Sequence, residues 1–310
     1  MGQASVFENR KWVPLFAGSA AFSWACAFPL IKLGLADFAI AGTDTGGKTL
    51  FAGVRFLLAG LAVLVIAKLC GRSFTVPNGK VRGQLVLFGI VNTALHYFFF
   101  YIGVSNSPGG RASILDSLGT FLLIIAACVV FKEKLTLQKS LGCLLGLGGI
   151  VLINLGSTAG RFTLNGDGML VCSSVCAMAG GLLTRVVTRK MDPLVATGHS
   201  LALGGALLVP AGLLSGARLV QINLHGILVL TALVTVSAVG FSFYNQLLRY
   251  HPVGQIAIYN AFIPVMGVVL SCLLLGEPFS LRYLVSGALV TAGICAVNLP
   301  AKPRKGTPSV

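Results

Sequence analysis

The stretch from Leu141 to Leu155 reads LGCLLGLGGIVLINL, and the stretch from Val285 to Leu299 reads VSGALVTAGICAVNL. The two align at an offset of 144 residues, the distance from Gly149 to Gly293. Further identities at this offset include Ile150 with Ile294, Asn154 with Asn298, and Leu155 with Leu299. A pattern that returns at a fixed spacing indicates a repeated structural unit.

The same offset holds over most of the two halves of the chain. It pairs Arg55 with His199, Ala94 with Ala238, Pro108 with Pro252, Gly110 with Gly254, Asp116 with Asn260, Glu133 with Glu277, and Thr136 with Ser280. The first apolar run of each half needs a longer offset, which pairs Lys32 with Arg185, because the loop 36–49 is longer than its counterpart. Insertions in surface loops are tolerated, so the repeat extends over five apolar runs.

The composition is that of a membrane protein. The 310 residues are 55% hydrophobic and 10% charged, with a mean hydropathy of +0.89, whereas soluble domains carry about 25% charged residues. Ten apolar runs are long enough to cross about 30 Å of hydrocarbon as helices. They are 12–35, 50–69, 83–105, 109–131, 137–155, 166–188, 193–216, 225–248, 253–275 and 280–299. The sequence therefore predicts an all-α membrane protein with ten transmembrane helices.

The basic residues predict the orientation in the membrane. With the N-terminus in the cytoplasm, 16 of the 23 Lys and Arg residues fall on the cytoplasmic side, as the positive-inside rule requires. Both termini are then cytoplasmic, and we expect a multi-pass protein of the cell membrane with tails at 1–11 and 300–310. The net charge of +15 marks this topology, and we predict no nucleic-acid partner.

Five helices in each repeat is an odd number, so the second copy enters the membrane upside down. The predicted repeats are 12–155 and 166–299. The loop after the fourth helix carries Lys132, Lys134 and Lys139, whereas the corresponding loop of the second repeat carries only Arg282. An inverted repeat is typical of transporters, with the substrate site near the midplane between the halves.

Several stretches resemble the EamA-type family of the drug/metabolite transporter superfamily. They are FSWACAFPLIKLGL (22–35), AGVRFLLAGLAVL (52–64), TALHYFFFYIGVSNSPGGRASIL (93–115), FKEKLT (131–136) and LGEPFS (275–280). The resemblance covers nearly the whole chain, with one departure: Pro264 matches a proline that the family often shows, but the equivalent position in the first half is Thr120. The resemblance implies transport of a small-molecule metabolite across the lipid bilayer without a cofactor.

Asp116 lies about eight residues into a predicted span, whereas the other seven acidic residues lie in the N-terminal tail, in loops or at span ends. A carboxylate at the centre of a transmembrane helix costs about 2.5–3.5 kcal/mol, so it needs a partner or a function. His96 and Asp116 are each ten residues from the turn near Asn106, and we expect them at equal depth, facing each other or a shared cavity. Two interpretations stay open: a site for a proton or a substrate amine, and a structural polar pair.

Other polar and aromatic residues inside the spans are candidates for lining that cavity, since they are unfavourable against lipid. The candidate substrate-binding set is Trp24, Asn92, His96, Tyr97, Asp116, Tyr244, Asn245, Tyr259 and Asn260. For each of them, packing between helices is the competing role. Four basic residues near span ends are candidate mouth charges, or else interface anchors: Lys32, Arg55, Arg185 and His199.

No motif predicts catalysis. The eight cysteines fall almost entirely within apolar runs without CxxC spacing, and no HExxH or DxxD occurs. We therefore expect no catalytic residues, no metal and no cofactor. The predicted function is a secondary carrier working by alternating access, an exporter rather than an importer. The alternatives are an intramembrane enzyme acting on a lipid-soluble substrate, and a channel. Proton coupling through Asp116 is a further hypothesis, and the sequence leaves monomer and dimer open.

Overall fold

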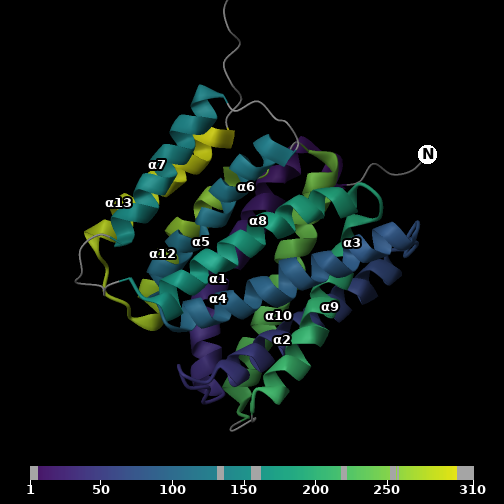
Figure 1. Cartoon of the computed structure of the whole chain (residues 1–310), viewed down its shortest axis with the longest axis horizontal. Helices are drawn as coiled ribbons and strands as arrows, with labels where there is room; N and C mark the ends of the chain where they lie inside the picture. Colours follow the sequence, from purple (N-terminus) through teal and green to yellow (C-terminus); the bar gives the residue numbers. More distant parts are fainter. Residues whose placement is uncertain are drawn as a thin grey trace, which may run out of the picture.

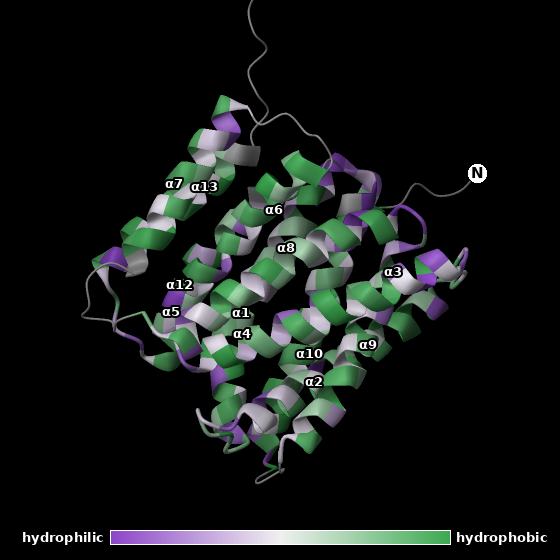
Figure 2. Cartoon of the chain, viewed as in Figure 1, coloured by the Kyte–Doolittle hydropathy of each residue, from purple (hydrophilic) through white to green (hydrophobic). Residues whose placement is uncertain are grey.

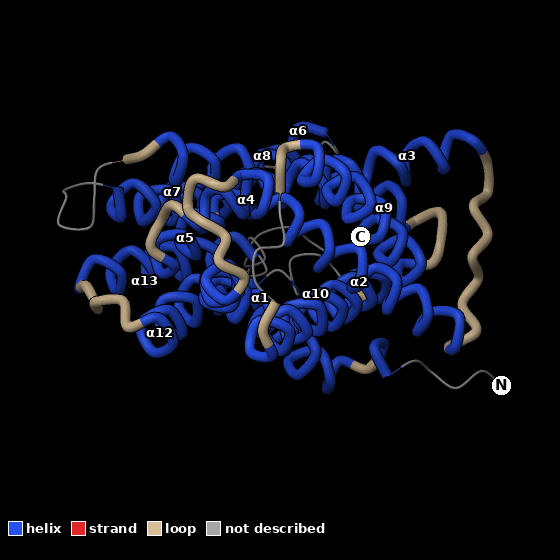
Figure 3. Tube along the Cα trace, turned by 90° about the horizontal axis from the view of Figure 1, so that it is seen from below, coloured by secondary structure: helices blue, strands red, loops and turns tan. Residues whose placement is uncertain are grey.

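The computed structural model describes residues 6–130, 136–154, 162–217, 222–251, 256 and 258–298. Within these residues the regular structure is entirely helical, as Figure 3 shows. The predicted tail 300–310, the loop residues Lys132, Glu133 and Lys134, and the pair Pro252 and Gly254 lie outside the described part of the chain.

The described residues of the first half form ten helical segments. They are η1 (Val6–Glu8), η2 (Arg10–Trp12), α1 (Val13–Asp37), α2 (Thr45–Leu69), α3 (Gly79–Gly89), η3 (Ile90–Leu95), α4 (His96–Ser105), α5 (Gly109–Asp116), α6 (Leu118–Val130) and α7 (Leu137–Asn154). The segments of the second half are η4 (Leu164–Gly168), α8 (Met169–Thr188), α9 (Pro193–Leu214), α10 (Leu224–Tyr250), η5 (Ile258–Ala261), α12 (Phe262–Leu275) and α13 (Leu281–Asn298).

Seven helical stretches in the described residues are long and apolar enough to cross a membrane. Three further apolar helices are shorter, Leu137–Leu152, Tyr259–Leu275 and Leu281–Ala296. Figure 2 shows apolar residues along the helices and polar residues gathered at helix ends and connections. The chain is therefore a multi-pass helical membrane protein, as predicted.

Two helices begin earlier than predicted because their first turns are capped. The carboxylate of Asp44 accepts a hydrogen bond from the backbone N–H of Gly47, so α2 begins at Thr45. The side chain of Asn78 accepts one from the N–H of Val81, so α3 begins at Gly79. Asp and Asn at these positions satisfy N–H groups that have no partner inside the helix.

Glycines allow α2 and α9 to pack backbone against backbone. A Cβ added at Gly60 would lie 2.2 Å from the backbone nitrogen of Ala202, and one at Gly205 would lie 2.2 Å from that of Leu57. Only glycine permits this approach, which is typical of helix contacts in membranes. The contact joins the second helix of one half to its counterpart in the other.

A second glycine contact joins α7 and α13, which lie side by side at one edge of the molecule (Figure 1). A Cβ at Gly149 would lie 2.8 Å from the carbonyl oxygen of Ser286. A Cβ at Gly293 would lie 2.6 Å from the carbonyl oxygen of Gly142. The sequence repeat that pairs Gly149 with Gly293 thus coincides with a contact between the same two helices.

The middle of the molecule is built around α1 and α8. Helix α1 packs against α10 and α12, and α8 packs against α4, η3 and α6. The largest buried cluster includes Phe28 of α1, Phe56 of α2 and Tyr101 of α4. These elements frame the space described next.

Candidate functional site

Three helical spans depart from α-helical geometry at residues that line one cavity. Residues Ile90–Leu95 are π-helical, and Ile258–Ala261 form a 3-10 turn before α12. Helix α5 ends at Asp116 and α6 begins at Leu118, because the N–H of Ser117 bonds to the carbonyl of Ile114 at 3.2 Å. Such irregularities inside helices are frequent at functional sites.

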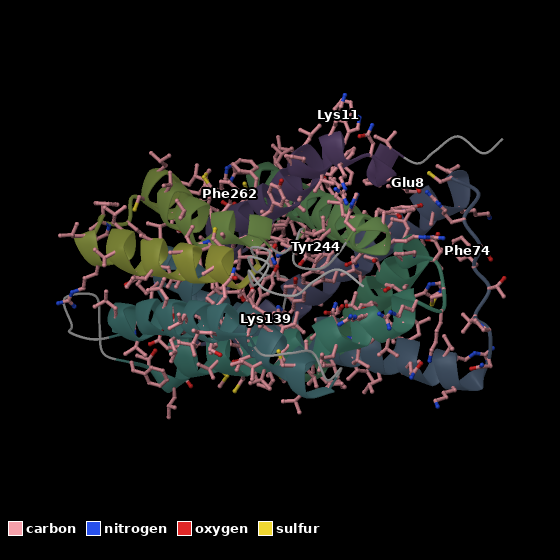
Figure 4. The ribbon with its side chains drawn as sticks, turned by 90° about the horizontal axis from the view of Figure 1, so that it is seen from above. Glu8, Lys11, Phe74, Lys139, Tyr244 and Phe262 are labelled. Atoms are coloured by element: carbon pink, nitrogen blue, oxygen red, sulfur yellow. The ribbon has the colours of Figure 1, made fainter. Side chains whose placement is uncertain are left out.

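These irregular segments border a cavity of about 460 Å³. Its walls come from α1, α2, η3, α4, α5, α6, α8, α10, η5 and α12. The size is that of an ordinary small-molecule site. Figure 4 shows Tyr244, one of the lining residues, near the centre of the molecule.

Most of the candidate substrate-binding residues lie on this cavity. The lining includes Trp24, Asn92, His96, Tyr97, Asp116, Tyr244, Asn245 and Asn260. Tyr259 is not among the lining residues; its ring stacks on Phe262 with 6.4 Å between centroids. Within the described residues, the cavity thus gathers side chains from both halves of the chain.

Arg185 lines the cavity near the C-terminal end of α8. Lys32 does not, because its Nζ pairs with Glu277 Oε1 at 3.1 Å. His199 also lies elsewhere, with its Nδ1 at 2.8 Å from the carbonyl oxygen of Val195.

The structure corrects the expected position of Arg55, which lies in the interior and not at a span end. Its side chain lines the cavity, yet the residue is only 2% exposed. Its Nη1 donates to the hydroxyl of Tyr101 at 2.9 Å, and its Nε donates to the hydroxyl of Ser237 at 2.9 Å. A buried guanidinium needs such partners, and here they join α2 to α4 and α10.

His96 and Asp116 share the cavity but form no hydrogen bond with each other in the described structure. The ring of His96 stacks against Phe100, with 5.9 Å between centroids, and meets the edge of Tyr97 at 4.4 Å. Its Nδ1 is buried without a hydrogen-bond partner. This arrangement differs from the bonded pair that one interpretation of the sequence requires.

One wall of the cavity consists of aromatic and amide side chains, with Trp24 from the first half and Tyr244 and Asn260 from the second. The indole of Trp24 packs against Tyr244, with 5.0 Å between centroids, and its Nε1 would lie 2.9 Å from a Cβ placed at Gly240. Asn260 Nδ2 donates to the hydroxyl of Tyr244 at 3.3 Å. The size of Trp24 is therefore accommodated by the absence of a side chain at residue 240.

The carboxylate of Glu277 caps the start of α5. Both oxygens of Glu277 accept hydrogen bonds, one from the N–H of Gly109 at 2.7 Å and one from the N–H of Gly110 at 3.2 Å. The same carboxylate pairs with Lys32 of α1. A negative charge is favourable at a helix N-terminus, so Glu277 links α5 and α1 to the connection before α13.

A buried ion pair joins the same helix, α5, to η4. Arg111 Nη2 and Asp167 Oδ2 are 2.8 Å apart, and both side chains are almost completely buried. Asp167 also accepts hydrogen bonds from the hydroxyl of Ser107 and the N–H of Thr163. This network joins the start of α5 to the start of the second half at η4.

The cavity extends toward the opposite end. Its lining there includes Arg185 and Thr188 of α8, Arg189 at the C-cap of α8, and His251 after α10. His251 Nε2 lies 2.7 Å from the carbonyl oxygen of Phe7, so this end is the one that the N-terminal segment covers. Neither Lys32, Glu277 nor Arg111 lines the cavity.

Some lining residues are not among the candidates from the sequence. A local sequence pattern indicates part of them. The α8 pattern Thr184-Arg185 and Thr188-Arg189 repeats a hydroxyl and a guanidinium at a spacing of four. Residues four apart share a helix face, so this stripe was visible in the sequence. Thr120 and His251 also line the cavity, and no local sequence signal distinguishes them.

The residue types around the cavity indicate which kind of ligand suits it. Among the described residues, no group of three or more His, Cys, Asp or Glu side chains lies close enough to hold a metal ion. The lining combines aromatic rings with hydroxyl, amide and charged groups, which is the composition of a site that orients a small molecule.

The fold is that of a polytopic helical membrane protein, and it encloses a cavity of the size that holds a small molecule. Comparison with known proteins gives the family: residues 11–155 and 164–299 each match the EamA-like transporter family. The chain belongs to that family, with one copy of its unit in each half.

Two relatives and a solved structure are similar to this chain over most of its length. The protein named "Uncharacterized transporter YvbV" of Bacillus subtilis (strain 168) is 23% identical, covering 91% of this chain and 90% of its own. The "Probable amino-acid metabolite efflux pump" of Salmonella typhimurium (strain LT2) is 25% identical, covering 87% and 89%. A crystal structure matches with a TM-score of 0.71 at 18% identity, covering 93% of this chain and 96% of that one, and thus shares the fold.

Proposed function

We propose that the protein is a secondary carrier that moves a small metabolite across the cell membrane by alternating access. The observation that carries this proposal is the cavity between the two halves, which reaches one end of the molecule while ion pairs close the other. A carrier needs a site that faces one side at a time.

An inverted arrangement of ten helices is part of this proposal. The packing supports it, since α1 lies on α10 as α8 lies on α4 and η3. The Gly149–Ser286 and Gly293–Gly142 contacts support it as well, because the offset of the repeat converts one pair into the other. With both termini in the cytoplasm, the cavity faces inward and the Glu277 and Asp167 links close the outer end.

We infer export as the direction of transport and an amino-acid-like metabolite as the cargo. Support for this inference comes from the Salmonella relative, whose name describes amino-acid metabolite efflux. An inward-facing cavity with basic residues at its mouth suits uptake of a carboxylate-bearing solute from the cytoplasm. The protein works as a monomer or a dimer, with the complete cavity in each chain.

Proton coupling through Asp116 belongs to the proposal. A carboxyl group on the cavity wall can take up a proton on one side and release it on the other. Reconstituted Asp116→Asn protein should then lose the pH dependence of transport. If it keeps the full pH dependence, the coupling group lies elsewhere.

Counterflow in proteoliposomes tests the carrier itself. Vesicles preloaded with one of a panel of unlabelled metabolites should take up the same labelled metabolite against its gradient, with saturable kinetics. Chemical conversion of the solute without net movement would indicate the intramembrane enzyme instead. Flux that neither saturates nor shows counterflow would indicate a channel.

A further inference from the structure

The break between α5 and α6 leaves one carboxylate open to the cavity. Asp116 is the last residue of α5 and lines the cavity. Within the described part of the chain its oxygens have neither a hydrogen bond nor an ion pair, and they are not among the fully enclosed atoms that lack a partner. The carboxylate therefore borders the empty space, where a charge without a counterion is costly.

The equivalent place in the second half is built differently. The offset of the repeat pairs Asp116 with Asn260, and it pairs Phe100 with Tyr244. In the second half the amide of Asn260 donates to the hydroxyl of Tyr244. In the first half the amide is replaced by a carboxylate and the hydroxyl is missing. The first half thus has a carboxylate, Asp116, where the second half has an amide bonded to a hydroxyl.

The surroundings of Asp116 favour a positive charge from the ligand. The carbonyl end of α5 adds partial negative charge at the same place. The rings of Tyr97, His96 and Phe100 contact one another on the adjoining wall, and aromatic faces attract cations. Arg55, the guanidinium on the wall from α2, is held by Tyr101 and Ser237.

We propose that Asp116 at this break binds the protonated amino group of the transported solute, with Tyr97 and Phe100 against the carbon atoms next to it. The proposal rests on the carrier function and assigns the substrate class. The ligands are organic amines that fit about 460 Å³, including amino acids with a free α-amino group. Sodium and the proton are the other cations that a carboxylate could take, and the test separates them.

Thermal stabilisation of the purified protein by matched ligands tests this subsite. The panel is the twenty common amino acids and their amides, each with its N-acetyl derivative, measured in potassium buffer with and without sodium. At least one free amine should stabilise the wild type, and its N-acetyl form should bind at least about tenfold more weakly, because the acetylated nitrogen carries neither a positive charge nor ammonium protons. Equal binding of the acetylated form, a sodium effect without an amine effect, or no response to any amine contradicts the proposal.

Variants distinguish loss of amine binding at this subsite from general destabilisation of the fold. Asp116→Asn should weaken amine binding at least about tenfold. The double variant Asp116→Asn with Phe100→Tyr reproduces the amide and hydroxyl of the second half, so it should unfold at or above the wild-type temperature and still not bind amines. Asp37→Asn, which alters a carboxylate beside His225 outside the cavity, should bind like the wild type. Amine binding by the double variant at wild-type strength excludes the subsite.

Flux measurements distinguish failure of this subsite from failure of the carrier. Saturable counterflow of an amine-free solute, unchanged by Asp116→Asn, would leave the carrier in place and remove the amine subsite. Amine binding that depends on Asp116, without movement of any solute, would leave the subsite and remove the carrier.

Discussion

Arg111 and Asp167 form a buried ion pair that joins the two halves of the chain, with 2.8 Å between Nη2 and Oδ2. Their side chains are 3% and 2% exposed. Removing one partner leaves the other charge buried, and this costs about 3–5 kcal/mol.

Arg111→Gln should therefore lower the free energy of unfolding in detergent by about 3–5 kcal/mol. Adding Asp167→Asn should recover part of the loss, because no unpaired charge then remains. Arg249→Gln is the matched control, since Arg249 meets Asp192 with its side chain 45% exposed and exposed pairs contribute about 0–1 kcal/mol. Equal losses for Arg111→Gln and Arg249→Gln would show that burial of the first pair has no energetic consequence.

Gly149 and Gly293 should tolerate no side chain. Gly293→Leu places a side chain where a Cβ already meets backbone at 2.6 Å, and forced overpacking costs about 1–3 kcal/mol or more. Gly148→Leu, in the same helix as Gly149, is the control because nothing lies within 4 Å of its Cβ position. Thermal unfolding should separate the two variants clearly. Similar unfolding temperatures would mean that α7 and α13 do not pack as described.

Arg55 should be sensitive even to lysine. Arg55→Lys keeps the charge, but an ammonium cannot reproduce the fork that reaches Tyr101 and Ser237 together. We expect a loss of about 1–3 kcal/mol in the free energy of unfolding. Tyr101→Phe, which removes one acceptor, should cost less. A lysine variant as stable as the wild type would show that the hydrogen bonds to Tyr101 and Ser237 do not stabilise the helix packing.

Glu277 should control access from the outer end. Glu277→Gln weakens both the ion pair with Lys32 and the acceptor at the start of α5, so the outward-open state should become more populated. With the eight native cysteines replaced, Ser113→Cys on α5 reports this change through its rate of labelling by an impermeant thiol reagent from outside.

Labelling of Ser113→Cys should become several-fold faster in the Glu277→Gln background. Asp37→Asn, a carboxylate change at the same end of α1 as Lys32, is the control and should leave the rate unchanged. Slower or unchanged labelling in Glu277→Gln would mean that another contact closes the outer end.

Much of the architecture follows from local patterns in the sequence. Apolar runs of about 20 residues predict the helices because a membrane leaves the backbone no other way to satisfy its polar groups. The predicted span begins at residue 50, whereas α2 begins at Thr45, because the length of an apolar run does not reveal the helix cap formed by Asp44. The family membership follows from motifs along the whole chain, and the two matched regions confirm it.

The sequence by itself determined the helical membrane class, the two repeated units and the presence of an acid, Asp116, within a span. Only the tertiary structure decided which groups meet. Lys32 and Glu277 are 245 residues apart, Arg55 finds its partners on α4 and α10, and Asp116 has no partner in the described structure. The physical reason is that helix formation depends on neighbours within a few residues, whereas hydrogen bonding across helices depends on how the two halves pack.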